Sequence, residues 1–202
     1  MIWIITNFRS VANKAANVAG VLWKLRRSLP KHVKKLLYQS LLESHLTYLI
    51  PVWGRANDQA IKRLQVLQNR ALRNVYNLDR LTNRVRMYTH MVESCLPIRS
   101  LFYLNSATLV YNITHLYTHS NIKFNRVGTR SRQRDNLRPL KSRTLYGSKS
   151  FQSFGPKIFN DIPEDIKRLS HVHGFKWALR CYIRKEEFND VSLSSKFSAK
   201  YF

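Results

Sequence analysis

Apolar residues recur at helical spacing in the N-terminal part of the chain, and this periodicity constrains the fold more than any other feature. Successive apolar positions are separated by four, three, four and three residues: Val11, Ala15, Val18, Leu22 and Leu25. An α-helix brings residues at this spacing onto one face, and that face needs a partner to cover it. We therefore expect a helix over residues 11–25 that packs against other helices.

Two further helices are expected before residue 80. Proline is tolerated in the first turn of a helix but not in its interior, so Pro30 and Pro51 delimit the second one. Its apolar positions are Val33, Leu37, Leu41 and Tyr48, widened by Leu36, Leu42, Leu46 and Leu49. Asn57 or Asp58 can cap a third helix, whose apolar positions are Ile61, Leu64, Leu67, Leu72 and Val75. Three helices with short connections predict a small bundle over residues 8–78.

The rest of the chain is also expected to be mainly helical. Helical spacing after Pro97, at Leu101, Leu104, Thr108, Tyr111 and His115, predicts a second helical section over residues 82–120. The periodicity fails over residues 121–149, which we interpret as a basic connector. A small C-terminal helical unit is expected over residues 150–188, interrupted at Gly155-Pro156 and ending in a helix capped by Ser170. Residues 189–202 are expected to form a disordered tail. The predicted fold class is mainly α.

Positive charge is the unusual property of the composition. The chain carries 35 Lys and Arg against 11 Asp and Glu, a formal net charge of +24, and each quarter of the sequence is basic. With 44% hydrophobic residues the chain is expected to fold despite this repulsion. Arginine is the more frequent base, and its planar guanidinium binds two phosphate oxygens at once. These observations indicate a polyanionic partner with phosphate groups.

Candidate phosphate contacts follow from the placement of basic residues on the expected helices. Lys62, Gln65, Asn69 and Arg73 are spaced three, four and four, so they form one polar edge of a helix that could follow a phosphate backbone. The candidate nucleic-acid-binding residues are Arg26, Arg27, Lys34, Lys35, Lys62, Arg63, Arg70, Arg73, Arg130, Arg132, Arg134 and Arg143. An ordinary solvated face is the alternative for the helix, and a nuclear import signal is an alternative for Arg130–Arg134.

The sequence offers little support for catalysis or metal binding. The motifs HExxH, GxSxG, GxGxxG and the P-loop are absent, and no aspartate pair stands between apolar strands. We therefore expect no catalytic residue, no metal and no cofactor. Cys95 and Cys181 are far apart and predict no disulfide framework, which favours an intracellular, nuclear or cytoplasmic protein that is not secreted. No stretch approaches the roughly 18 apolar residues of a membrane span, so no membrane partner is expected.

A series of short motifs occurs in a characteristic order over roughly residues 8–185. The motifs are Leu37-Tyr-Gln-Ser-Leu41, Leu46-Thr-Tyr48, Pro51-Val-Trp-Gly54, Leu67-Gln-Asn-Arg-Ala-Leu-Arg73, Arg143-Thr-Leu-Tyr-Gly147, Lys149-Ser-Phe151, Gly155-Pro-Lys-Ile-Phe-Asn160, Ile162-Pro163 and Phe175-Lys176. Their order and spacing resemble the region downstream of the polymerase palm in reverse transcriptases of non-LTR retrotransposons. One departure is Phe159, where the family usually has tryptophan.

The resemblance implies a thumb-like bundle at residues 8–78, which in such enzymes grips the template–primer duplex, followed by a C-terminal domain. It implies RNA, DNA or an RNA–DNA hybrid as partner, bound through phosphate contacts. The fingers and palm, with the aspartate pair that binds Mg²⁺, would precede residue 1, so the chain is not expected to be an enzyme on its own. The alternatives are an accessory part of an RNA-directed DNA polymerase that acts with a separately encoded palm, and a retroelement remnant without function.

Overall fold

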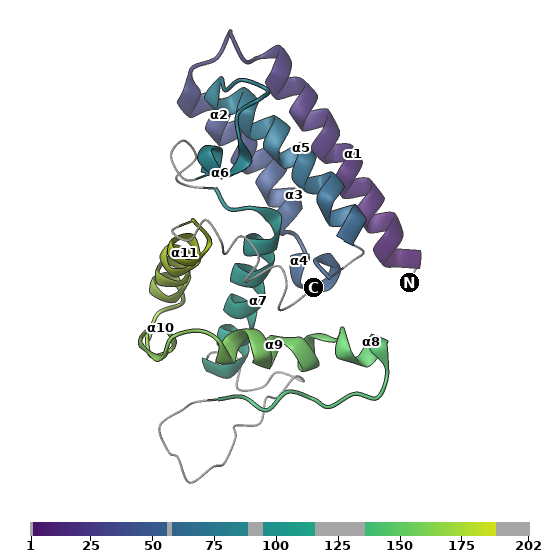
Figure 1. Cartoon of the computed structure of the whole chain (residues 1–202), viewed down its shortest axis with the longest axis vertical. Coiled ribbons are helices and arrows are strands. Elements are labelled where there is room, and N and C mark those ends of the chain that lie inside the picture. Colours follow the sequence, from purple (N-terminus) through teal and green to yellow (C-terminus); the bar gives the residue numbers. More distant parts are fainter. Residues whose placement is uncertain (1, 56–57, 89–94, 116–135, 189–202) are drawn as a thin grey trace. The chain divides into compact units, whose positions relative to one another are not determined.

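The computed structural model describes residues 2–55, 58–88, 95–115 and 136–188, and this part of the chain is mainly helical, as predicted. The chain divides into two compact units, residues 1–101 and residues 102–202. Figure 1 labels the helices of both. The division falls within the predicted helical section of residues 82–120. Residues 116–135, which include most of the expected connector, and the expected tail lie outside the described residues.

No helix in the described ranges combines the length and the apolar character that crossing a bilayer requires.

The first unit is built on two long helices, α1 (Ile2–Lys24) and α5 (Asp58–Tyr76), which lie side by side (Figure 1). The predicted apolar stripe of α1 is confirmed at Val11, Ala15 and Leu22, which are buried together with Ala19. Small side chains at two of these positions let the helix axes approach closely, because side-chain size sets the distance between packed helices. The helix also begins earlier than predicted, at Ile2.

A π-helical stretch lies in the middle of the second predicted helix. The segment consists of α2 (Lys31–Leu37), the π-helix η1 (Tyr38–Glu43) and α3 (Ser44–Thr47), and α4 (Ile50–Trp53) follows it. Its buried residues are spaced by four throughout: Lys34, Tyr38, Leu42 and Leu46.

The predicted apolar face of this segment is partly wrong. Leu42 and Leu46 are buried as expected, but Leu36, Leu41, Tyr48 and Leu49 are exposed. The Ser44 N–H donates to the Gln39 carbonyl five residues earlier, so each turn of η1 holds more residues than an α-turn. The buried positions Lys34, Tyr38 and Leu42 each lie one residue after the expected positions, and this offset is already present in α2, before η1 begins.

A polar network is buried where α5 meets residues 96–98, at the start of α7 (Ile98–His115). Gln65 Oε1 accepts a hydrogen bond from the Ile98 N–H at 2.9 Å, and its Nε2 donates to Asn69 Oδ1 at 2.8 Å. Gln68 Nε2 donates to the Leu96 carbonyl at 2.9 Å and to the Tyr38 hydroxyl. The prediction that Gln65 and Asn69 face a phosphate backbone is wrong, because both side chains are buried and bonded inside the unit.

Burial raises the pKa of Tyr38 well above the usual value of a phenol, near 10. Below that pH the hydroxyl is protonated in the folded and the unfolded chain, whereas above it the unfolded chain loses the proton first. The free energy of unfolding should therefore be unaffected by this group below pH 10 and fall above it, by up to about 1.4 kcal/mol per pH unit. Urea titrations at pH 8–11.5 should show a shallower alkaline fall for Tyr38→Phe, and an unchanged slope would contradict this assignment.

In the second unit, aromatic side chains of α7 pack against those of α9 (Phe151–Asn160) and α11 (Val172–Phe188), and the short helix α10 (Glu164–Lys167) lies between these two in the chain. The Tyr111 ring stacks on Phe175 with centroids 4.3 Å apart, and its hydroxyl donates to the Leu169 carbonyl. The Tyr103 hydroxyl donates to the Ile158 carbonyl at 3.2 Å. These bonds satisfy the polar ends of rings whose bodies form the core.

The expected interruption at Gly155-Pro156 is wrong, because α9 continues through it. Proline has no N–H, so Pro156 cannot donate to the carbonyl of Gln152 four residues earlier. The Leu140 N–H takes this place and donates to the Gln152 carbonyl at 3.2 Å. Residues 136–149, with the short helix α8 (Leu145–Ser148), therefore include a segment attached to α9 rather than a free connector.

A second attachment lies at the end of α9. The Leu137 N–H donates to Asn160 Oδ1 at 2.8 Å, and Asn160 Nδ2 returns a bond to the Leu137 carbonyl at 2.9 Å. Leu137 is itself buried. The side-chain amide of Asn160 thus pairs with this backbone as a neighbouring strand would.

Gly155 allows α9 to lie close to α7. A Cβ atom at this position would stand 3.0 Å from Val110 Cγ2 and 3.4 Å from the Phe151 ring. We expect Gly155→Val to lower the free energy of unfolding by about 1–3 kcal/mol, because the extra methyl groups overfill the core. Gly174→Ala in α11 is the matched control, since a Cβ there meets nothing within 4 Å. Thermal denaturation that ranks the two variants equally would contradict the close approach.

Candidate nucleic-acid interface

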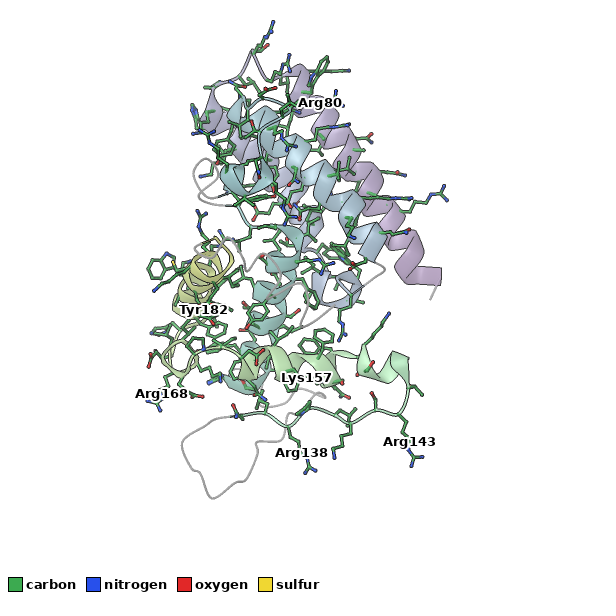
Figure 2. The ribbon with its side chains drawn as sticks, in the orientation of Figure 1. Arg80, Arg138, Arg143, Lys157, Arg168 and Tyr182 are labelled. Atoms are coloured by element: carbon green, nitrogen blue, oxygen red, sulfur yellow. The ribbon has the colours of Figure 1, made fainter. Side chains whose placement is uncertain are left out.

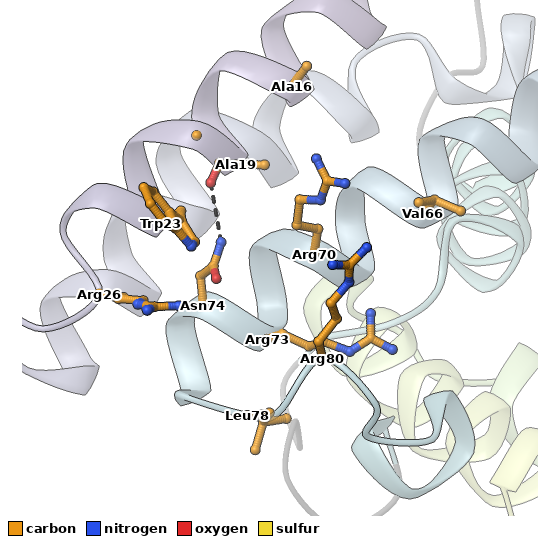
Figure 3. A pocket seen from close by; sticks show the side chains of 11 residues that line it. Ala16, Ala19, Trp23, Arg26, Val66, Arg70, Arg73, Asn74, Leu78 and Arg80 are labelled. Carbon is orange, nitrogen blue, oxygen red and sulfur yellow. Dashed lines mark hydrogen bonds between the residues drawn. The ribbon is translucent and has the colours of Figure 1, made fainter.

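Four arginines line one groove between α1 and α5. The groove has a volume of about 640 Å³, and its basic residues are Arg26, Arg70, Arg73 and Arg80. Figure 3 shows Arg70, Arg73 and Arg80 gathered on one side, with Trp23 of α1 and Arg26 of the turn after α1 across from them. Asn74 lies at the bottom, where its Nδ2 donates to the Ala19 carbonyl of α1 at 3.3 Å. We call this the arginine groove.

The turn after α5 brings Arg80 into the arginine groove. Asn77 adopts the left-handed conformation, with φ of 53°, and the Leu78 N–H donates to the Arg73 carbonyl at 2.9 Å. This is the Schellman pattern that ends helices, with asparagine in the place that glycine usually takes. The chain then turns back along α5, where Arg73 Nη2 donates to the Thr82 carbonyl at 3.0 Å. The guanidinium of Arg80 thereby reaches the same groove as Arg70 and Arg73.

A smaller hollow of about 320 Å³ adjoins the arginine groove and adds a fifth arginine. It shares Arg26 and Arg73 with the groove and is also lined by Arg27 and Asn77. Arg27 is exposed, and Arg26 is half-buried because its guanidinium lies over the Trp23 ring, 5.3 Å from the centroid. Of the predicted site residues, the structure therefore brings together Arg26, Arg27, Arg70 and Arg73.

Among the residues that the structure describes, the arginines of the groove have no acidic partner. Within the described ranges, no carboxylate forms an ion pair with Arg26, Arg70, Arg73 or Arg80. Arg73 Nε is also buried without a hydrogen-bond partner among these residues. Buried N–H groups are nearly always paired, so an orphan donor beside a cationic groove favours an anion or water there. Four guanidinium groups to which the described part of the chain supplies no counter-charge make a strongly positive surface.

Lys34 does not belong to this surface, and its prediction as a phosphate contact is wrong. The side chain is only 1% exposed, and its Nζ donates to the Arg26 carbonyl at 2.9 Å and to Asn77 Oδ1 at 2.8 Å. Burial lowers the pKa of this ammonium. Lys34 thus ties the turn after α1 to the end of α5, the two segments that carry the arginines.

The remaining predicted contacts lie elsewhere. Lys62 and Arg63 are exposed on α5 but do not line the groove, and Lys62 Nζ lies 3.9 Å from Asp58 Oδ2. Lys35 is half-buried on α2. In the second unit, Arg143 is exposed on the segment after Leu137, where it projects together with Arg138 (Figure 2). Arg130, Arg132 and Arg134 lie outside the described residues.

Sequence reasoning missed Trp23 and Arg80. Trp23 directly follows a buried leucine of α1, so spacing alone places it beside the core rather than in a groove. Arg80 follows α5 by four residues, and only the left-handed residue at Asn77 decides that it returns to the helix. An asparagine just after a helical pattern is a known stop signal and could have pointed to this turn.

Comparisons of the chain with protein-family models, curated proteins and solved structures find no match. In the described part of the chain, no group of three or more His, Cys, Asp or Glu side chains is placed to hold a metal ion. The arginine groove is therefore the candidate functional site of the chain.

Replacing Lys34 tests its role as a tie between the two helix ends. Lys34→Met keeps much of the side-chain volume but leaves the Arg26 carbonyl and Asn77 Oδ1 without their donor. We expect the free energy of unfolding to fall by about 1–3 kcal/mol, the usual cost of unsatisfied buried groups. Lys35→Met is the control, with the same chemical change at the half-buried neighbour. Equal denaturation midpoints for the two variants would contradict the tie.

Proposed function

We propose that the first unit binds nucleic acid, with the phosphates of one strand held in the arginine groove. The observation that carries this proposal is the convergence of Arg26, Arg70, Arg73 and Arg80 on one groove without a carboxylate partner in the described residues. Guanidinium groups bind phosphate oxygens in pairs, and bound phosphates would remove the repulsion among the four charges. The net charge of +24 favours a polymeric anion over a single small one.

The contacts available in the groove favour the backbone over base edges. Asparagine and glutamine are the side chains that read adenine, but Gln65, Gln68 and Asn69 are buried in the network of the core. Asn74 is held by the Ala19 carbonyl. An arginine can also pair with guanine, but four that converge on one groove suit the phosphates of a strand, so we propose binding chiefly through phosphates.

The resemblance to non-LTR retrotransposon reverse transcriptases extends this proposal to the origin of the chain. We propose that the chain is a thumb and C-terminal fragment of a non-LTR retrotransposon reverse transcriptase, without a polymerase active site of its own. The mainly helical fold supports this, as does the position of the arginine groove within the residues similar to the thumb, 8–78, and the turn that follows them. In such a fragment the groove would hold a strand of the template–primer.

Salt dependence tests the phosphate contacts. Each phosphate neutralised on a single strand contributes about −0.7 to the slope of log K against log salt. We expect Arg70→Gln and Arg80→Gln each to make this slope shallower by about that amount, as measured by fluorescence anisotropy with a labelled oligonucleotide between 50 and 300 mM salt.

Arg168→Gln is the matched control, because it removes one exposed positive charge from the second unit (Figure 2). Its slope should stay within error of the wild type. If Arg168→Gln changes the slope as much as Arg70→Gln does, net charge and not the groove determines binding, and the proposal fails.

A further inference from the structure

The arginine groove has a second half that carries no charge. Its residues are Ala16, Ala19, Gly20, Trp23 and Val66. Phosphate binding makes no use of them. An indole and small side chains beside a cluster of cations suit a ligand that is flat and apolar at one end and anionic at the other.

Trp23 is the large aromatic surface in this half. The residue is 56% exposed although it lines a groove, and the Arg26 guanidinium lies over its ring. Burying an exposed indole against another flat ring is favourable, and a cation on the ring adds to the stack. Trp23 is therefore poised to stack on a planar group that enters the groove.

The groove has room for such a group. Its volume of about 640 Å³ falls within the range of small-ligand sites, roughly 300–1,000 Å³. A Cβ atom at Gly20 would meet nothing within 4 Å, so the space above this residue is open. Glycine inside α1 costs about 0.5–1 kcal/mol of stability relative to alanine, and no close helix contact requires it here.

We propose that the arginine groove binds an unpaired nucleotide, with its base stacked on Trp23 and the adjoining phosphates on Arg70, Arg73 and Arg80. The inference rests on the proposed function and names its substrate class as single-stranded nucleic acid. In a duplex both faces of each base are already covered by neighbouring bases, so only an unpaired base can give a face to the indole. An acidic amphipathic peptide could also fit the two halves, but a planar base matches the indole and phosphate matches the guanidinium fork better.

The test compares two labelled strands of the same length on the full chain, oligo-dT12 and a 12-mer of abasic sites. Both carry the phosphates, but only the first carries bases. We expect the wild type to bind oligo-dT12 about 5–150-fold more tightly, the range that corresponds to one stacked base. Trp23→Ala should abolish this preference while keeping the affinity for the abasic strand and the salt slope. Trp177→Ala is the matched control, because Trp177 is 66% exposed on α11 of the second unit.

A second variant blocks the groove without removing an aromatic ring. Gly20→Leu places a side chain in the open space, and its preference for oligo-dT12 should fall as in Trp23→Ala. Because leucine is a better helix former than glycine, circular dichroism should show an equally or more stable helix. Retention of the full preference by both Trp23→Ala and Gly20→Leu would overturn the inference.

The outcomes separate this inference from the proposed function. If neither strand binds, the groove does not hold nucleic acid and both proposals fail. If both strands bind equally to the wild type, phosphate binding stands and the stacking inference is overturned. If polyglutamate of equal charge displaces oligo-dT12 at the same concentration as unlabelled oligo-dT12, the groove recognises an acidic peptide as well, which also overturns it.

Discussion

Close packing of α1 on α5 is the constraint on which the rest of the first unit depends. Ala15 and Ala19 are each only 1% exposed, and their small size lets Asn74 of α5 reach the Ala19 carbonyl. A larger residue in this seam would separate the helices, because interiors leave no space to absorb it. On the open side of the same seam the two helices diverge around the arginine groove (Figure 3). The core contact and the candidate interface are therefore two sides of one helix pair.

Some positive charges of the chain are buried and bind the backbone, whereas others are exposed and can bind a ligand. Composition does not distinguish the two groups. Lys34 and Lys167 are buried and donate to main-chain carbonyls, of Arg26 and Asn160 respectively, so each ties down backbone near the end of a helix. A flexible stem and a compact ammonium suit this task, whereas a guanidinium is wider and binds best to planar acceptors. Arg70 and Arg80 are exposed instead, which leaves their guanidinium groups free for a polyanion.

The helices were predictable where side-chain spacing and neighbouring signals agreed. The core positions of α5 and the start of α7 after Pro97 follow from local pattern and proline chemistry. The prediction failed where a non-local partner replaced a local one. The Leu140 N–H donates to the Gln152 carbonyl that Pro156 cannot reach, so this proline does not end the helix. Gln65 accepts a hydrogen bond from the Ile98 N–H in the core, so this polar residue is buried instead of exposed.

The sequence by itself determined the helical class, the excess of arginine and the positions of the longest amphipathic helices, because helix periodicity and charge are local properties of the chain. Only the tertiary structure decided which arginines line the same groove and which lysines are buried. Arg80 reaches Arg70 through a left-handed turn at Asn77, and Lys34 faces inward, where its ammonium binds the Arg26 carbonyl and Asn77 Oδ1. Convergence of this kind depends on turn conformation and on packing between distant segments, which spacing along the chain does not encode.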